Sequence, residues 1–139
     1  MEINYNDFLI SDDKSLIQAE RVYELLRTTY WAENRSIEII RKTIQNSLCF
    51  GVYTNDLLIG FARCVTDYSV MYWLCDVIID EKYRGQGLGK ALMKAITEHK
   101  DLKFLRGMLA TTNAHGLYEQ YGFKHDKDSF MRKIPNQSK

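Results

Sequence analysis

Three glycines in one short loop are the residues of this chain best suited to chemistry. Gly85, Gly87 and Gly89 follow the apolar run 77–79 and lead into a stretch, 88–99, in which apolar residues recur at helical spacing. Glycine lets the backbone approach a ligand closely, and a helix N-terminus offers free N–H groups and the positive end of its dipole. The loop is predicted to bind a phosphate, although the pattern also fits an ordinary tight turn.

Two cations beside the glycines strengthen this interpretation. Arg84 and Lys90 lie where a positive charge is unfavourable unless an anion is present. A dinucleotide-binding fingerprint needs glycine at position 90 and an acidic residue about 20 positions later, so it fits poorly. A P-loop needs glycine in place of Arg84 and a hydroxyl residue in place of Ala91. Nucleotide hydrolysis is therefore not expected.

The pattern that does fit, Arg84-x-x-Gly87-x-Gly89, resembles the cofactor-binding signature of the GNAT acetyltransferases. The segment 116–123, Gly-Leu-Tyr-Glu-Gln-Tyr-Gly-Phe, resembles a second signature of that family, a helix that carries Tyr-Glu and ends in Gly-Phe. Both signatures occur in the family's order, and the order of elements matches as well. The resemblance therefore covers nearly the whole chain.

The resemblance implies acetyl-CoA as the co-substrate and assigns its contacts. The residues that match the pyrophosphate loop are Arg84, Gly85, Gln86, Gly87, Leu88, Gly89 and Lys90. Val77, Ile78 and Ile79 match the strand edge that pairs with the pantetheine arm, where one amide would polarise the thioester carbonyl; they also fit an ordinary core strand. Thr111 stands where the family often has asparagine, so Asn113 is the expected cofactor contact and helix cap.

Tyr118 matches the tyrosine that, in this family, protonates the departing CoA thiolate. A phenol with a pKa near ~10 is protonated at neutral pH, and a thiol near ~8.5 is close enough to share its proton. A helical tyrosine among apolar neighbours also fits the core, which is the role expected for Tyr121.

Attack by an alkyl amine requires removal of its proton, which costs roughly 4–5 kcal/mol at pH 7 for a pKa of ~10.4. Asp76, a lone acid in an apolar strand beside the expected thioester site, is the first candidate for this step. A structural ion pair with Arg63 or Arg106 explains Asp76 equally well. Glu33 is a weaker candidate base.

Aromatic residues indicate where the acceptor binds. Trp31 and Glu33 belong to a segment that often forms one wall of the acceptor pocket in this family, although it also fits core packing at a helix end. Tyr53, Tyr72 and Trp73 are further candidates, because alternation alone does not decide which strand face they occupy. The acceptor itself, a small-molecule or peptide amine, is not specified by the sequence.

The composition excludes several other classes. Nineteen Lys and Arg against 18 Asp and Glu leave a net charge of +1, which gives no reason to expect nucleic acid or an anionic membrane as a partner. No apolar run approaches the roughly 20 residues of a membrane span, and the first residues lack a secretory pattern, so a cytoplasmic location is expected. No metal is expected. The three cysteines, Cys49, Cys64 and Cys75, are predicted to be buried free thiols, and a cysteine nucleophile would need a nearby histidine.

The elements that must position these residues follow from periodicity and turn residues. Strands are expected at 3–10, 48–54, 57–67, 71–80 and 103–110, helices at 14–28, 36–46, from 88 and at 114–121, and a final hairpin around 126–128. This order predicts one α/β (α+β) domain over 1–139, with a mixed, mostly antiparallel twisted sheet of six or seven strands and about four helices. The resemblance implies that strands 71–80 and 103–110 splay apart around the cofactor.

The leading hypothesis is an N-acetyltransferase that moves acetyl from acetyl-CoA to a primary amine by direct attack in a ternary complex, with Tyr118 as the general acid. The alternative is a catalytically silent acyl-CoA-binding or sensing domain of the same fold. A structural or nucleic-acid module would need a basic surface, and the local basic cluster at 82–94 is already explained by cofactor phosphates. Many members of the family pair as homodimers, but the sequence shows no interface signal.

Overall fold

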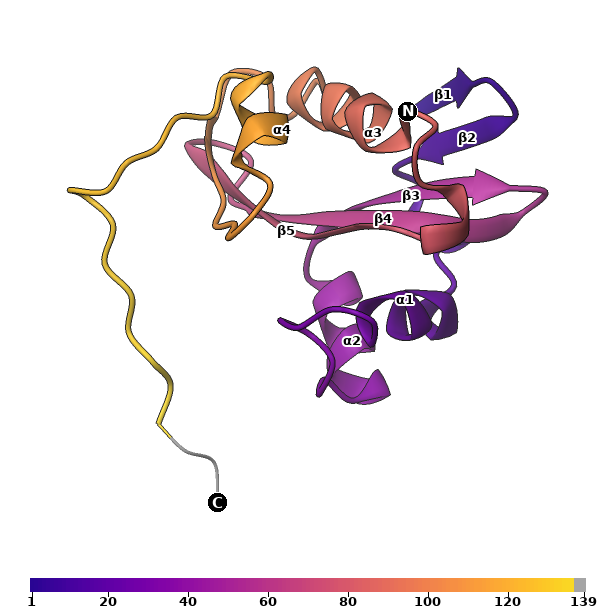
Figure 1. The fold of residues 1–139 in the computed structure, drawn as a ribbon, viewed down its shortest axis with the longest axis horizontal. Helices are drawn as coiled ribbons and strands as arrows, with labels where there is room; N and C mark the ends of the chain where they lie inside the picture. Colours follow the sequence, from indigo (N-terminus) through magenta and orange to yellow (C-terminus); the bar gives the residue numbers. More distant parts are fainter. Residues whose placement is uncertain (137–139) are drawn as a thin grey trace.

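A single six-stranded sheet forms the centre of the molecule (Figure 1). The computed structural model describes residues 1–136. The strands are β1 (Glu2–Tyr5), β2 (Phe8–Ser11), β3 (Leu48–Thr54), β4 (Leu57–Thr66), β5 (Met71–Ile79) and β6 (Arg106–Met108). They lie in the order β1-β2-β3-β4-β5-β6, each antiparallel to its neighbour except β6, which runs parallel to β5. A parallel pair requires a crossover, and this crossover carries the helix that follows the glycine loop.

Helices cover both faces of the sheet (Figure 1). The helices are α1 (Ala19–Leu26), α2 (Ile37–Gln45), α3 (Leu88–Thr97) and α4 (His115–Glu119), with two 3-10 turns, η1 (Lys14–Leu16) and η2 (Glu81–Tyr83). α1 and α2 lie on one face, and α3 and α4 lie on the other. The core is accordingly divided into two apolar clusters, one between the sheet and α3 and one between the sheet and the α1–α2 pair.

Local chemistry accounts for the start of α2 and for the turn between β3 and β4. Ser36 caps α2 through its side-chain oxygen, which accepts a hydrogen bond from the Ile39 amide at 3.2 Å. Asn55 and Asp56 both take positive φ, 47° and 68°, in the tight turn between β3 and β4, and Asn-Asp turns of this kind match the twist of a hairpin. The strands predicted at 48–54 and 57–67 are therefore confirmed, and they form an antiparallel hairpin.

The sheet opens between β5 and β6. The two strands pair only at Met71–Arg106, Tyr72–Gly107 and Trp73–Met108. β5 continues to Ile79, and no strand within residues 1–136 pairs with its later part on this side. The predicted splay is confirmed, and it leaves backbone N–H and C=O groups of β5 free to bind an extended ligand.

A β-bulge lies on β5 beside this opening. Phe61 pairs with Ile78 and Arg63 pairs with Cys75, so a single β4 residue lies opposite two β5 residues, Asp76 and its successor. Asp76 has a φ of 56°, in the left-handed region that is unusual for residues other than glycine. The bulge therefore re-aims the backbone of β5 where the sheet opens.

The N-terminal prediction was too simple in two places. The expected strand 3–10 is two strands, β1 and β2, because Asn6 takes a positive φ of 53° in a turn with Asp7, and asparagine tolerates that conformation. The expected helix 14–28 is the turn η1 followed by α1, because Ile17 is extended and interrupts the helix.

The C-terminal prediction was wrong. Residues 124–136 form no strand, and the chain leaves the body of the molecule after α4 (Figure 1). The expected hairpin around 126–128 buries too little apolar surface to form, because this charged stretch is exposed throughout. The strand expected at 103–110 is limited to β6. Among the described residues, no helix is both long and apolar enough to cross a membrane.

Candidate active site

The glycine loop is held in a conformation that only glycine adopts easily. Gly85 and Gly87 both have a φ of 81°, and Gly87 is the N-cap of α3. A Cβ atom added at Gly87 would lie 2.5 Å from the Tyr5 Oη atom. That hydroxyl donates a hydrogen bond to the Gln86 carbonyl at 3.1 Å. β1 therefore supports the loop, and a side chain at position 87 would have to displace the Tyr5 hydroxyl.

The first turn of α3 presents free amides to open space. The first hydrogen bond within the helix runs from the Ala91 amide to the Gly87 carbonyl at 3.0 Å, so the amides of 87–90 precede the helical ladder. A Cβ atom added at Gly89 would meet nothing within 4 Å. Lys90 is exposed, and Arg84 donates from Nε to the Ile79 carbonyl at 3.0 Å. These features together fit a bound anion.

The Tyr-Glu helix lies against the same turn of α3. The Tyr121 hydroxyl donates to the Lys90 carbonyl at 2.9 Å, so Tyr121 ties α4 to α3 in addition to packing. Tyr118, one turn earlier, is half-buried and packs edge-to-face on Phe123, with ring centroids 6.2 Å apart. Burial raises the pKa of Tyr118, so its phenol is protonated at neutral pH.

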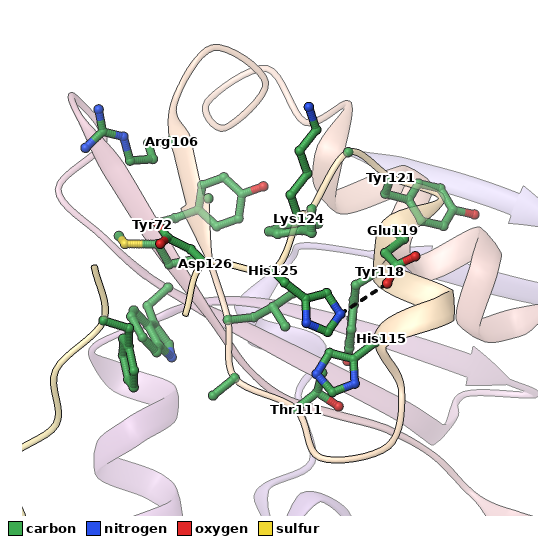
Figure 2. Close-up of a pocket in the computed structure, with 18 of the residues that line it drawn as sticks. Tyr72, Arg106, Thr111, His115, Tyr118, Glu119, Tyr121, Lys124, His125 and Asp126 are labelled. Atoms are coloured by element: carbon green, nitrogen blue, oxygen red, sulfur yellow. Dashed lines mark ion pairs between the residues drawn. The ribbon is translucent and has the colours of Figure 1, made fainter. Parts of the chain in front are cut away.

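A pocket of about 800 Å³ lies between β6, α4 and the C-terminal segment (Figure 2). Tyr118 is among its lining residues, but no residue of the glycine loop is. His115 and His125 stack at 4.4 Å within it, and the His125 Nε2 atom lies 3.3 Å from Glu119 Oε1. The pocket is therefore separate from the glycine loop. Residues of α4 line the pocket, and Tyr121, just after α4, contacts the helix that follows the loop.

Asp76 is the centre of a buried cluster of charges. Its Oδ2 atom accepts hydrogen bonds from Arg63 Nε at 2.6 Å and from Arg35 Nη1 at 2.8 Å. Its Oδ1 atom accepts one from Trp31 Nε1 at 3.1 Å. Burial by itself would raise the pKa of Asp76, but the charges and hydrogen bonds of the two arginines outweigh it and hold that pKa below its usual range.

These contacts decide between two structural predictions for Asp76. The ion pair with Arg63 is confirmed, whereas Arg106 forms no ion pair within residues 1–136. Arg35 was missed, because it is 41 positions away from Asp76 and belongs to no motif. The role of Asp76 as a base stays a prediction.

Replacing Asp76 by asparagine is expected to lower the free energy of unfolding at pH 7 by about 2–4 kcal/mol, because it leaves two partly buried arginines unpaired. The folded-state pKa is depressed, so this stabilisation is present above the unfolded pKa of ~3.9 and is lost as pH falls through the lower, folded value. Urea unfolding at pH 7 and at pH 3 measures both effects. Asp128→Asn, at an exposed site, is the control, and an equal effect of the two substitutions would contradict the prediction.

The segment between α1 and α2 reaches across the opening in the sheet. The hydroxyls of Tyr30 and Thr112 lie 2.7 Å apart, which joins this segment to the loop after β6. The rings of Tyr30 and Trp31 meet edge-to-face at 5.2 Å, and both are exposed. Glu33 is exposed and forms no ion pair in the described part of the chain. The aromatic segment therefore lies at the surface beside β5 rather than in the core.

Other predicted site residues fall in different places. Tyr53 is buried in the α1–α2 cluster, and Tyr72 is buried on the α3 side, where it borders the pocket beside α4. Trp73 contacts Phe130 of the C-terminal segment, with ring centroids 5.8 Å apart. Asn113 is exposed and does not cap α4, because Ala114 is the N-cap residue.

The cysteines are free thiols, as predicted. Cys49 and Cys64 are buried, which raises their pKa to about 11 and about 12, respectively, while Cys75 is only partly buried. Thiols with such a pKa are protonated at neutral pH and are poor nucleophiles. Within residues 1–136, no three side chains of His, Cys, Asp or Glu are grouped to hold a metal ion.

The fold and the site together define a class of protein. An open mixed sheet, a glycine loop with free amides at a helix N-terminus and a tyrosine on the adjacent helix are together the arrangement of the GNAT fold. The chain belongs to the GNAT acetyltransferase family, because residues 45–125 match the model of the acetyltransferase (GNAT) domain.

Individual relatives agree with this assignment. An uncharacterised ycf52-like N-acetyltransferase of Prochlorococcus marinus is 37% identical over 102 residues, which are 68% of this chain and 56% of that protein. A protein from Xanthomonas campestris described as a GNAT-family acetyltransferase has a structure that superposes with a TM-score of 0.89, at 35% identity, over 95% of this chain and 96% of that one. A GNAT-family acetyltransferase from Elizabethkingia anophelis with acetyl-CoA bound shares the fold, with a TM-score of 0.67 and 21% identity over 95% and 90% of the two chains. The chain spans between 28% and 56% of the length of the first curated relatives it matches.

Proposed function

We propose that this protein transfers the acetyl group of acetyl-CoA to a primary amine by direct attack in a ternary complex. The observation that carries the proposal is the contact between the two signature elements, the glycine loop with α3 and the Tyr-Glu helix. The Tyr121 hydroxyl, just after the Tyr118 helix, binds the first turn of α3, next to the glycine loop. Membership of the GNAT family supports acetyl transfer as the class of reaction.

The residues present fit acetyl-CoA. Free amides at 87–90 and the open space at Gly89 suit the pyrophosphate, with Arg84 and Lys90 as counter-charges. The proposed phosphate-binding set is the whole loop, Arg84, Gly85, Gln86, Gly87, Leu88, Gly89 and Lys90. Val77, Ile78 and Ile79 would bind the pantetheine through the main chain, and Asn113 is a weaker candidate. When bound, acetyl-CoA supplies the activated acetyl group.

A backbone amide and the Tyr118 hydroxyl would stabilise the negative charge of the reaction and supply a proton to the leaving group. A β5 amide at the bulge, next to Asp76, would donate to the acetyl oxygen as negative charge develops on it during attack. Tyr118 would donate its proton to the sulfur that leaves. Its raised pKa keeps that proton in place at neutral pH until a thiolate forms nearby. Trp31 and Glu33 are the proposed acceptor contacts.

Removal of the amine proton by Asp76 is a separate prediction. The three donors on its carboxylate favour the structural alternative, because they lower its pKa and occupy its oxygens. If Asp76 is the base, Asp76→Asn should shift the pH–rate profile to higher pH, since more of the amine must then be free in solution. A lower rate with no shift would leave Asp76 structural.

Calorimetric titration with acetyl-CoA, followed by assays of CoA release with a panel of primary amines, tests the proposed function. Micromolar binding together with amine-dependent CoA release is expected. Binding without turnover on any amine would favour a sensing domain. No binding would contradict the proposed function in either form.

A further inference from the structure

We infer that Arg35 and Arg63 form a subsite for an anionic group of the acceptor, so that the preferred substrate is an amine that also bears a carboxylate or a phosphate. This inference rests on the proposed function and names its substrate class.

The charge at the bulge does not balance. Arg35 and Arg63 share a single carboxylate, Asp76, and neither arginine forms an ion pair with any other acid within residues 1–136. Two positive charges against one negative charge leave one positive charge. A charge in a partly buried place calls for a counter-charge, and the described chain does not provide it.

The arginines also keep unused donors. Each guanidinium carries five N–H groups. Arg63 uses Nε for Asp76 and Nη1 for the Ser47 hydroxyl at 3.3 Å, whereas Arg35 uses only Nη1 among its contacts with residues 1–136. The Arg35 side chain is 26% exposed, compared with 12% for Arg63 and 2% for Asp76. Arg63 therefore neutralises the buried acid, and Arg35 is the more accessible of the two guanidinium groups.

The position of the cluster suits an acceptor rather than the cofactor. Arg35 and Trp31 come from the segment between α1 and α2, on the face of the sheet opposite α3 and its glycine loop (Figure 1). The cofactor phosphates would bind at the loop, on the other face. Both faces meet at the bulge of β5, where Asp76 and its neighbouring amide lie. An acceptor that enters past Arg35 would therefore meet the acetyl group at the bulge.

The same geometry disfavours a polycation. Two acids belong to the cluster and to the segment 30–33. Asp76 already binds three donors, and Glu33 is exposed. A polyamine would bring further positive charge to a site with a surplus of it. A planar fork of guanidinium donors instead matches the oxygens of a carboxylate or a phosphate.

Matched amine pairs provide the first test, with the rate of CoA release as the readout. Glycine is compared with glycinamide, glucosamine 6-phosphate with glucosamine, and spermidine serves as the polycation. In at least one pair, kcat/KM should be about tenfold or more higher for the anionic member, as charge-assisted hydrogen bonds predict, and the preference should weaken at high salt. Arg35→Gln should remove the preference through KM and leave the Kd for acetyl-CoA unchanged, and Arg35→Lys should restore part of it. Arg41→Gln, at an exposed arginine of α2, is the matched control.

A second readout does not depend on turnover. The side-chain Nε–H resonance of Arg35, assigned by its loss in Arg35→Gln, is followed by NMR during titration with acetate and with inorganic phosphate. A saturable shift with one of them supports the subsite and identifies which oxyanion it prefers. No shift with either, a preference for neutral amines or spermidine, or an equal loss of activity on both members of a pair in Arg35→Gln would overturn the inference. Absence of acetyl-CoA binding would instead contradict the proposed function, and the NMR titration would still decide the subsite.

Discussion

Replacing Tyr118 by phenylalanine is expected to lower kcat by about 10²–10⁴-fold, the range typical of a lost general acid. The substitution removes only the hydroxyl, so the packing of the ring on Phe123 should persist and the protein should stay folded. The Kd for acetyl-CoA should not change, because the phenolic proton matters only once the sulfur begins to leave. Single-turnover rates and calorimetry measure the two quantities separately.

The chain offers a matched control for this experiment. Tyr121→Phe removes a hydroxyl from the turn directly after the same helix and loses one hydrogen bond, to the Lys90 carbonyl, so about 1 kcal/mol of stability is at stake. We expect it to have a much smaller effect on kcat than Tyr118→Phe. The pH dependence adds a further test, because burial raises the pKa of Tyr118. Loss of its proton should therefore reduce kcat only at pH values above ~10. An unchanged kcat in Tyr118→Phe would remove Tyr118 as the acid.

Replacing Gly87 by glutamate is expected to abolish measurable binding of acetyl-CoA. The left-handed conformation costs a residue with a side chain about 1–2 kcal/mol. The new Cβ would also displace Tyr5, which supports the loop. A carboxylate beside the free amides would in addition repel the phosphates. Calorimetric titration measures the loss, and a thermal melt verifies that the protein is folded.

Two further variants separate the effect of backbone strain on acetyl-CoA binding from the effect of the added charge. Gly87→Ala keeps the backbone strain and the clash without the charge. Gln86→Glu adds the charge at an exposed position where φ is not positive, and its effect should fall as salt is raised. If Gly87→Glu bound acetyl-CoA as tightly as the natural protein, the loop would not be the phosphate site.

Features that depend on neighbouring residues could be predicted from the sequence. The glycine loop, the β3–β4 hairpin and the Tyr-Glu helix are each encoded within a few positions, and the apolar periodicity of α3 identified the helix behind the loop. The turn at Asn6 was missed because apolar residues lie on both sides of it, so that the sequence of 3–10 resembles one continuous strand.

Features that depend on distant residues could not be predicted in this way. Asp76 was recognised as unusual because a lone acid stands out in an apolar strand, but Trp31 and Arg35 reach it from the segment between α1 and α2, 45 and 41 positions away along the chain. The support of the glycine loop by Tyr5 joins positions 81 residues apart. The prediction of the C-terminal hairpin was wrong for the opposite reason. The local turn residues were present, but the flanking residues have too little apolar surface to bury.

The open edge of β5 has a consequence for solubility. A strand with unpaired N–H and C=O groups attracts strands of other chains and invites aggregation, and natural proteins protect such edges with bulges and with charged side chains that point inward. Asp76 provides both devices at one residue, through its left-handed backbone and its buried carboxylate. The distortion that leaves the sheet open for a ligand thereby also discourages a foreign strand from filling it.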